Sequence, residues 1–331
     1  MQVLRETYAL YGFYPLDTPL IESSEVLLAK GGGETEKQIY RFTKGDSDLS
    51  LRFDLTVPLA KYVAQHYGEL TFPFRRFQIG KVYRGERAQR GRFREFYQAD
   101  IDVIGDGKLD IINEAEVPSI IYKTFTSLGL QRFKIRINNR KVLNGFFAIL
   151  GLTEKAGDVM RTIDKLEKIG IDNVKAELRE RGIDDAAIDR LQPILELRGD
   201  NRRKLSALRD VLSGSETGLK GVEELETVFG YVERLGIALA VELDLSLARG
   251  LNYYTGAIFE VKANDYAIGS ICGGGRYDDL TGIFGMPDTS GVGISFGADR
   301  IYDVMVGLEL FPEEVNFSTK VLFVNLGADE E

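Results

Sequence analysis

Two runs of alternating apolar and polar residues, 72–84 and 93–104, are the clearest pattern in the first third of the chain. A polar segment containing Gly91 joins them, so the pattern predicts a long antiparallel hairpin. Shorter strands are predicted on either side of a turn at 44–47. Apolar residues at helical spacing predict the helices 3–11, 55–67 and 110–128, and one more strand is predicted at 133–138.

The pattern changes between residues 142 and 229, where helical spacing and mixed charge replace the strand signal. This stretch is interpreted as a helical module inserted into a sheet-bearing domain. Strand patterns return at 238–244, 257–263, 291–295 and 320–326, and a helix is predicted at 298–308. The order of elements favours the α+β class, with six or seven antiparallel strands flanked by helices, over alternating βαβ units.

The charge distribution is uneven along the 331 residues. With 42 basic and 51 acidic side chains the net charge is −9, which by itself argues against a polyanionic partner. Residues 75–94, however, hold eight basic side chains and one acidic one, and residues 132–141 hold five basic side chains and no acidic one. Such runs are usually solvated surface, but these lie on strand-like sequence, so an anion-binding surface stays open as the alternative.

The composition excludes several kinds of site. A single cysteine, Cys272, excludes an internal disulfide framework and a zinc site built from thiolates, and it is expected to be a small buried side chain. The single histidine, His66, excludes clustered imidazole ligands and is expected on a helix surface. Neither a membrane-spanning run nor a secretory leader is found, so a soluble, cytoplasmic protein is predicted.

Alternation along the hairpin gathers unlike side chains on one face. In the second run these are Arg94, Phe96, Gln98, Asp100 and Asp102, and in the first run Arg76, Gln78, Gly80, Val82 and Arg84. A solvated face and a ligand platform both explain this mixture. The arginines favour the ligand platform, because a planar guanidinium binds phosphate oxygens in bidentate fashion.

Three further segments are candidates for chemistry. Asp54 and Thr56 follow a strand-like run, where the carboxylate either holds an ammonium group or caps the next helix. The segment 247–256 contains an arginine and two tyrosines, and the glycines of 273–277 either bring the backbone close to a ligand or form a tight turn. No GxxxxGK[ST] phosphate loop is present, so a nucleotide would bind without that device.

Taken together, these segments resemble the histidyl-tRNA synthetases, a family of class II aminoacyl-tRNA synthetases. The resemblance extends from residue 11 to residue 301 and rests on the segments 51–58, 77–102, 249–256, 273–277 and 291–300. The segment 249–256 is specific to these enzymes and their close paralogue, whereas 77–102 and 291–300 resemble the wider class II motifs 2 and 3. Pro19 is similar to the proline of motif 1, and Asp54-Leu55-Thr56 resembles the eukaryotic-type branch.

The resemblance implies a site for ATP together with Mg²⁺. Arg84 would hold the α-phosphate, Glu86 would read the adenine, and Phe96 would stack on its ring. Arg92 and Arg300 would hold the γ-phosphate. No protein side chain is assigned to a metal.

The resemblance also implies a histidine pocket. Asp54 and Thr56 would receive the ammonium group, Gln98 would help to hold the amino acid, and Asp102 and Tyr254 would bind the imidazole. The implied histidine-binding set is Asp54, Thr56, Arg84, Gln98, Asp102, Arg249, Tyr253 and Tyr254. Arg84 and Arg249 are the implied catalytic pair, which lie on opposite sides of the α-phosphate.

The implied reaction is the activation of histidine by ATP to histidyl-adenylate, followed by transfer to the 3′ end of tRNA-His. Arg87, Gln89 and Arg90 would approach the acceptor stem, and a homodimer is expected. Residues 1–141 and 230–318 would form the catalytic core, 142–229 the helical insertion, and 319–331 the first strand of an anticodon-binding domain. Because most of that last domain is absent from the sequence, transfer to tRNA is expected to be impaired.

One alternative comes from a different functional class, the non-catalytic histidine-binding paralogue that regulates ATP phosphoribosyltransferase. That paralogue generally lacks the helical insertion, and it tends to lose the arginines at the positions of Arg84, Arg92 and Arg300. A module that only binds tRNA is a third interpretation, which leaves the joint presence of Gln98 and Asp102 unexplained. Asn252 stands where many relatives of the enzyme carry aspartate, and its effect on the turn is left open.

Overall fold

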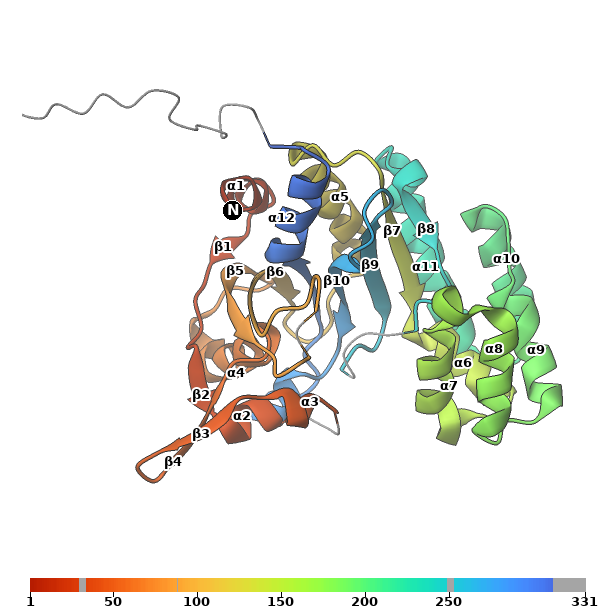
Figure 1. Cartoon of the computed structure of the whole chain (residues 1–331), viewed down its shortest axis with the longest axis horizontal. Coiled ribbons are helices and arrows are strands. Elements are labelled where there is room, and N and C mark those ends of the chain that lie inside the picture. Colours follow the sequence, from red (N-terminus) through yellow and green to blue (C-terminus); the bar gives the residue numbers. More distant parts are fainter. Residues whose placement is uncertain (30–33, 88, 249–252, 312–331) are drawn as a thin grey trace, which may run out of the picture.

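The computed structural model describes residues 1–29, 34–87, 89–248 and 253–311. Its centre is an eight-stranded sheet in the order β1-β5-β6-β11-β10-β9-β7-β8 (Figure 1). The strands are β1 (Tyr14–Pro15), β5 (Phe74–Tyr83), β6 (Glu95–Ile104), β7 (Phe133–Asn139), β8 (Val241–Leu243), β9 (Ala257–Ala263), β10 (Ser270–Tyr277) and β11 (Gly291–Gly297). This arrangement confirms the α+β class.

The predicted hairpin forms the middle of this sheet. β5 and β6 pair antiparallel over ten residues, with Arg76 opposite Asp102 and Gln78 opposite Asp100. The prediction of six or seven antiparallel strands was incomplete, because β1 adds a short edge strand parallel to β5 and because β8, which lies within the strand predicted at 238–244, runs parallel to β7. A strand of two residues is too short to show a period of two in the sequence.

Twelve α-helices lie in the described part of the chain. The helices before the hairpin and beside it are α1 (Gln2–Leu10), α2 (Ser24–Leu28), α3 (Glu34–Gln38), α4 (Thr56–His66) and α5 (Ile112–Ser127). Those that follow are α6 (Arg140–Ile149), α7 (Ala156–Ile163), α8 (Leu166–Glu180), α9 (Asp185–Leu195), α10 (Asn201–Val211), α11 (Glu216–Arg234) and α12 (Ala298–Gly307). In the described part of the chain no helix is both long and apolar enough to cross a membrane.

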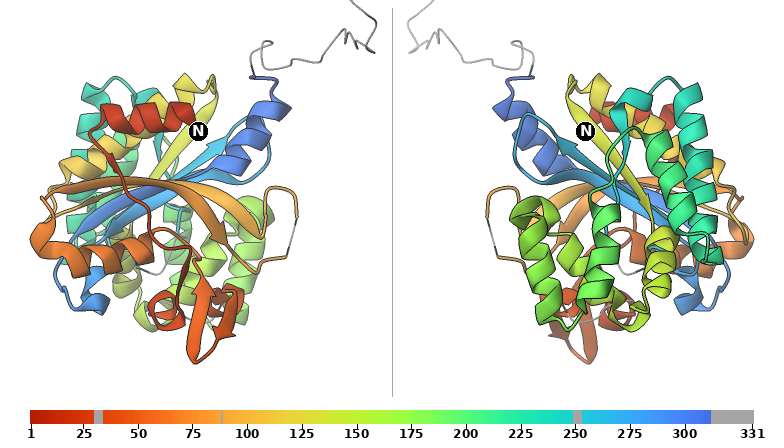
Figure 2. Two further views of the ribbon diagram at one scale, coloured as in Figure 1. Left: turned by 90° about the vertical axis from the view of Figure 1, so that its left-hand side faces the viewer. Right: turned by 90° about the vertical axis from the view of Figure 1, so that its right-hand side faces the viewer.

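The two faces of the sheet differ because side chains alternate along β6. Ala99, Ile101 and Val103 belong to the main apolar core, and the hydroxyl of Tyr8 in α1 donates to the Ala99 carbonyl at 3.1 Å. α1 and α5 cover this face, whereas α7 and its neighbours lie on the other side of the sheet (Figure 2). The opposite face of β6 presents polar side chains, as the alternation predicted, and it carries the candidate site.

A second, three-stranded sheet lies beside the main one. Its order is β2-β4-β3, with β2 (Ile21–Ser23), β3 (Arg41–Lys44) and β4 (Ser47–Leu51). The predicted turn lies between β3 and β4, where Gly45 adopts a φ of 60°. α4 then starts at Thr56 and carries Pro58 in its first turn, where its missing N–H does no harm.

The predicted helical module is connected to the core by two helices that touch each other. A Cβ atom on Gly145 of α6 would lie 2.4 Å from the Gly218 Cα of α11, so the two backbones cross at a pair of glycines. α11 also contacts α5 and β7, whereas α7 to α9 lie away from the sheet (Figure 1). The domain boundaries at 142, 229 and 318 stay predictions, and the strand predicted at 320–326 lies outside the described residues.

The glycine-rich segment proved to be the interior of a strand. The interpretation as a tight turn is wrong, since Gly273, Gly274 and Gly275 all pair within β10. The alternative, a close approach of this backbone to a ligand, stays a prediction. A Cβ on Gly274 would lie 2.1 Å from the Gly293 carbonyl oxygen of β11, and one on Gly275 would lie 2.6 Å from the Ala257 carbonyl oxygen of β9. Only glycine allows this spacing, and the missing side chains leave room above the sheet.

Replacing Gly274 by alanine is expected to lower the free energy of unfolding by about 3 kcal/mol, because its neighbours on β11 are backbone atoms that cannot move aside. Gly273→Ala is the matched control. Its Cβ would meet only the Phe259 carbonyl oxygen, at 3.5 Å, so a change below about 1 kcal/mol is expected. Urea unfolding followed by circular dichroism measures both, and equal midpoints for the two variants would contradict the prediction.

Candidate active site

Two joined cavities open on the polar face of the sheet. The larger has a volume of about 290 Å³ and the smaller about 30 Å³. Arg84, Gln98, Tyr254 and Ser295 line both of them. A ligand in the larger cavity is therefore in direct reach of a ligand in the smaller one, and Arg84 is the cation at their junction.

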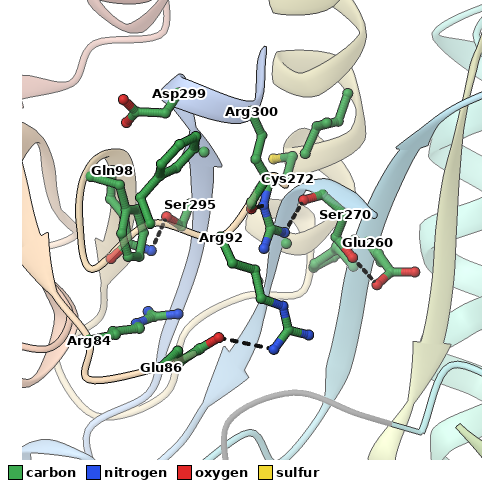
Figure 3. A pocket seen from close by; sticks show the side chains of 18 of the residues that line it. Arg84, Glu86, Arg92, Gln98, Glu260, Ser270, Cys272, Ser295, Asp299 and Arg300 are labelled. Atoms are coloured by element: carbon green, nitrogen blue, oxygen red, sulfur yellow. Dashed lines mark hydrogen bonds and ion pairs between the residues drawn. The ribbon is translucent and has the colours of Figure 1, made fainter. Parts of the chain in front are cut away.

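The position of Arg84 is fixed by two aromatic rings. Its guanidinium carbon lies 4.4 Å from the centre of the Phe53 ring and 5.2 Å from that of Phe96. Its Nε donates to the Phe53 carbonyl oxygen at 3.2 Å. These contacts aim the terminal nitrogens of Arg84 at the cavities, as Figure 3 shows.

Two more arginines reach the larger cavity from distant parts of the chain (Figure 3). Arg92, in the loop between β5 and β6, forms an ion pair with Glu86 at 3.0 Å. Arg300, in α12, donates from Nε to the Gly91 carbonyl at 2.6 Å and from Nη1 to the Ser270 carbonyl at 2.7 Å. Three guanidinium groups thus share one cavity with the ring of Phe96, which suits a ligand with several phosphates and a flat base.

The acidic groups of the larger cavity are Glu86, Glu260 and Asp299. Glu260 is 5% exposed, accepts a hydrogen bond from the Ser270 hydroxyl and lies 3.6 Å from the Lys262 ammonium. In the part of the chain that the structure describes, no three potential ligand side chains cluster tightly enough to hold a metal by themselves. The donor set therefore fits Mg²⁺ that arrives on phosphates and takes one or two carboxylates from the protein.

Asp54 lines the smaller cavity and also caps a helix. Its Oδ1 accepts from the backbone N–H groups of Thr56 at 3.0 Å and of Val57 at 2.9 Å. Asp54 can therefore cap α4 and contact a ligand in the smaller cavity at the same time. Burial raises the pKa of Asp54, while the two backbone hydrogen bonds and the charge of Arg84 oppose that shift.

Asp102 is held by two neighbours beneath the smaller cavity. Its Oδ1 accepts from the Tyr277 hydroxyl at 2.8 Å, and its Oδ2 forms an ion pair with Arg76 at 2.8 Å. Arg76 is completely buried and also donates to the Leu55 carbonyl at 2.9 Å. Burial raises the pKa of Asp102, and the charge of Arg76 opposes this rise.

Two tyrosines close the smaller cavity. Tyr253 and Tyr254 pack edge to face with ring centres 5.0 Å apart, and Tyr253 packs in the same way on Tyr277. The backbone of the next residue is anchored, because the Thr255 N–H donates to the Arg276 carbonyl at 2.8 Å. Arg276 in turn forms an ion pair with the buried Glu114 at 2.6 Å. The residue that follows the tyrosines is therefore hydrogen-bonded to a residue that is itself held by an ion pair inside the fold.

The loop between β5 and β6 projects from the larger cavity. Arg87, Gln89 and Arg90 are exposed on it, and the Gln89 and Arg92 backbones pair across a tight turn. Arg90 donates to the Tyr266 hydroxyl at 2.5 Å and lies 4.9 Å above that ring, which fixes the loop against the turn between β9 and β10. The loop therefore presents cations at the entrance of the site.

The structure brings most of the predicted site residues together. Around the larger cavity lie Arg84, Glu86, Arg92, Phe96 and Arg300, and around the smaller one Asp54, Thr56, Gln98, Asp102, Tyr253 and Tyr254. Arg249 and Asn252 lie outside the described residues. His66 on the helix surface and buried Cys272, which lines the larger cavity, are as expected.

Several lining residues were not assigned a role from the sequence. They are Ser295, Asp100, Tyr277, Glu260 and Ser270, together with Arg76 below the smaller cavity. Alternation did place Asp100 and Arg76 on the polar face, so a signal for these two was present. Ser295 is on β11, which pairs with β6, and Glu260 is on β9, which is separated from β11 by β10; no local pattern encodes this order of strands.

Comparison with known proteins agrees with this geometry. The sequence model of the family described as histidyl-tRNA synthetase matches residues 1–301. Histidine–tRNA ligase of Clostridium tetani is 54% identical over 301 residues, which is 90% of this chain and 68% of the relative. That of Bacteroides fragilis is 50% identical over 350 aligned positions, which cover 99% of this chain and 76% of the relative. The relatives are bacterial, so they lend no support to the predicted eukaryotic-type branch.

Solved structures agree as well. A histidyl-tRNA synthetase from Nostoc has a TM-score of 0.85 at 41% identity, covering 94% of this chain and 72% of that one. A Bacillus halodurans structure described as an ATP phosphoribosyltransferase regulatory subunit/histidyl-tRNA synthetase has a TM-score of 0.79 at 25% identity, covering 91% of this chain and 77% of that one.

The mainly antiparallel sheet with its arginine-lined cavity and adjoining acidic pocket defines a class II aminoacyl-tRNA synthetase. Within that class the relatives agree on one amino acid. The chain belongs to the histidyl-tRNA synthetase family.

Proposed function

We propose that this chain activates histidine with ATP, releasing pyrophosphate, and passes the histidyl group to the 3′ end of tRNA-His. The observation that carries the proposal is the junction of the two cavities at Arg84. ATP in the larger cavity and histidine in the smaller one bring the amino acid carboxylate next to the α-phosphate. The names of the relatives supply the amino acid and the RNA.

The larger cavity would position the triphosphate. Arg84 holds the α-phosphate, Arg92 and Arg300 hold the γ-phosphate, and Phe96 stacks on the adenine while Glu86 reads it. Arg92 would then exchange its ion pair with Glu86 for the phosphate, which leaves the Glu86 carboxylate able to accept from the base. Mg²⁺ bound to the phosphates, with Glu260 as a carboxylate ligand, would neutralise part of their charge.

The smaller cavity would orient histidine. Asp54 and Thr56 receive its ammonium group, Gln98 holds its backbone, and Asp102 and Tyr254 contact its imidazole. Gln98 itself is fixed by a hydrogen bond from its amide to the Ser295 hydroxyl at 2.8 Å. A carboxylate oxygen of the substrate attacks the α-phosphorus in line, a new P–O bond forms, and the bond to the β-phosphate oxygen breaks.

Charge stabilisation accounts for the chemistry of this step. Negative charge grows on the oxygens around the α-phosphorus, and the fixed guanidinium of Arg84 faces them without having to reorganise. Arg249, from the resemblance, takes the opposite side of that phosphate. Tyr253 supports the pocket through its ring contacts with Tyr254 and Tyr277.

The macromolecular partner and the oligomeric state belong to the same proposal. Arg87, Gln89 and Arg90 on the exposed loop would contact the acceptor stem of the tRNA through its phosphates. A second copy of the chain would pair beside the three-stranded sheet, where Tyr40 and Phe42 are exposed. A cytoplasmic location is part of the proposal too.

Histidine-dependent exchange of labelled pyrophosphate into ATP tests the proposal without any tRNA. We expect exchange with histidine and Mg²⁺ and none with the other amino acids, because exchange requires reversible formation of the adenylate. Binding of histidine without any exchange would favour the regulatory paralogue instead. The three arginines of the larger cavity, which that paralogue tends to lose, favour the enzyme.

A further inference from the structure

A second carboxyl group lies beside Asp102 in the smaller cavity. Asp100 is two residues away on β6, lines the same cavity and is 3% exposed. The Oδ1 of Asp102 accepts from the Tyr277 hydroxyl, and its Oδ2 is ion-paired with Arg76 but makes no hydrogen bond among the described residues. The Oδ1 of Asp100 is likewise buried without a hydrogen-bond partner among the described residues. A buried acceptor of this kind costs stability unless a ligand satisfies it.

The charge balance around the cavity points to the chemistry of that ligand. Three carboxyl groups, Asp54, Asp100 and Asp102, line the cavity, and two guanidinium groups, Arg76 and Arg84, lie against them. Arg52 also acts on Asp100 but does not line the cavity, and with all three acids ionised the five side chains at the cavity carry a net charge of −1. A proton on Asp100, or a cation in the cavity, removes it.

The surroundings of Asp100 bring the pKa of its carboxyl group close to neutral pH. Burial raises the pKa of Asp100 to about 7, with the charges of Asp102 and Asp54 acting in the same direction. Arg76 and a hydrogen bond with Ser295, the residue opposite Asp100 on β11, act against the rise. The charged and titratable groups acting on it, across every neighbouring element, are Arg52, Asp54, Arg76, Asp102, Tyr8, Tyr254 and Cys272.

We propose that Asp100 is a further specificity-determining residue, whose carboxyl group hydrogen-bonds a ring nitrogen of the bound imidazole and shares one proton with it. The proposal rests on the proposed function, since it takes histidine as the occupant. A neutral imidazole offers one donor and one acceptor nitrogen, and an imidazolium offers two donors. Because Asp102 would accept from one ring N–H, Asp100 faces the other ring nitrogen. Protonated Asp100 matches that nitrogen as the acceptor of a neutral imidazole, and ionised Asp100 matches it as the second donor of an imidazolium, so the complex keeps one proton in either arrangement.

This sharing makes histidine binding depend on pH in a defined direction. Above pH 7 free Asp100 loses its proton, and free imidazole, with a pKa of about 6.5, has none either. Binding must then take up a proton from water, so the KM for histidine should rise close to tenfold between pH 7.5 and pH 8.5. The KM for ATP should stay level, because Asp100 does not line the larger cavity.

Asp100→Asn removes the titrating group and keeps the size of the side chain. We expect its KM for histidine to change less than twofold between pH 7.5 and pH 8.5, whatever its absolute value. Asp106→Asn is the matched control, an exposed aspartate just beyond β6 that accepts from the Tyr67 hydroxyl, and it should keep the wild-type slope. Ser295→Ala, which removes an opposing hydrogen bond, should move the rise to higher pH.

Calorimetry provides a readout that needs no catalysis. Titration of wild-type protein with histidine at pH 8, in two buffers of different ionisation enthalpy, should show uptake of close to one proton per histidine, and Asp100→Asn should show close to none. Binding without proton uptake in the wild type, or the same uptake in Asp100→Asn, would overturn the role of Asp100. No binding of histidine to the wild type would contradict the proposed function itself.

Discussion

Arg84→Ala is expected to reduce histidine-dependent pyrophosphate exchange by about a thousandfold, in the range seen when a fixed charge-stabilising group is removed from an active site. The guanidinium of Arg84 lies at the junction of the two cavities, between the rings of Phe53 and Phe96. No other cation lines both cavities among the described residues. Water would replace it in the variant, and water must reorganise as the charge develops.

The matched control is Arg132→Ala, which removes an arginine that is 74% exposed and paired with Asp265 at 3.0 Å. Exchange should stay within twofold of the wild type. An Arg84→Ala protein that folds and keeps more than a tenth of the exchange rate would show that the attack at phosphorus is stabilised elsewhere.

Arg76→Met is expected to lower the free energy of unfolding by about 3 to 5 kcal/mol, the loss typical of removing one partner of a buried ion pair. Arg76 is completely buried and pairs with Asp102 at 2.8 Å, in a pocket that also holds Asp100 and Asp54. Methionine fills a similar volume but leaves these carboxyl groups without their compensating charge. The urea unfolding midpoint at pH 7.5 measures the effect.

Arg75→Met tests the neighbouring arginine on the same strand, which is 20% exposed and pairs with Glu116 at 2.7 Å. It should cost about 1 kcal/mol, because water reaches that pair. Adding Asp102→Asn to Arg76→Met should recover part of the loss, since one uncompensated charge is removed with it. Equal midpoints for Arg75→Met and Arg76→Met would contradict the argument from buried charge.

The sequence predicted the fold where local patterns are long. The hairpin of β5 and β6, the helix α4 and the helix α12 agree with their patterns to within two residues. β10 was not recognised as a strand, because three successive glycines remove the side chains whose alternation identifies one. Its partners β9 and β11 leave no room for a side chain at Gly274 and Gly275, and that constraint comes from tertiary structure alone.

The candidate site was predicted in two unequal ways. Alternation placed Gln98, Asp100 and Asp102 on one polar face, but it could not tell a solvated surface from a pocket. The resemblance supplied a role for each predicted ATP- and histidine-binding residue. Those of them that lie in the described part of the chain line the two joined cavities. Neither source pointed to Ser295, since its contact with Gln98 joins positions that are 197 residues apart.

The glycine contact between α6 and α11 allows the segment between these helices to vary in length among members of the family. Both ends of the segment between these helices leave the core at nearly the same point. The entropy of closing such an excursion grows only slowly with its length, by roughly 0.6 kcal/mol for each doubling. Lineages can therefore lengthen, trim or replace the intervening helices while the sheet and its two cavities keep their shape.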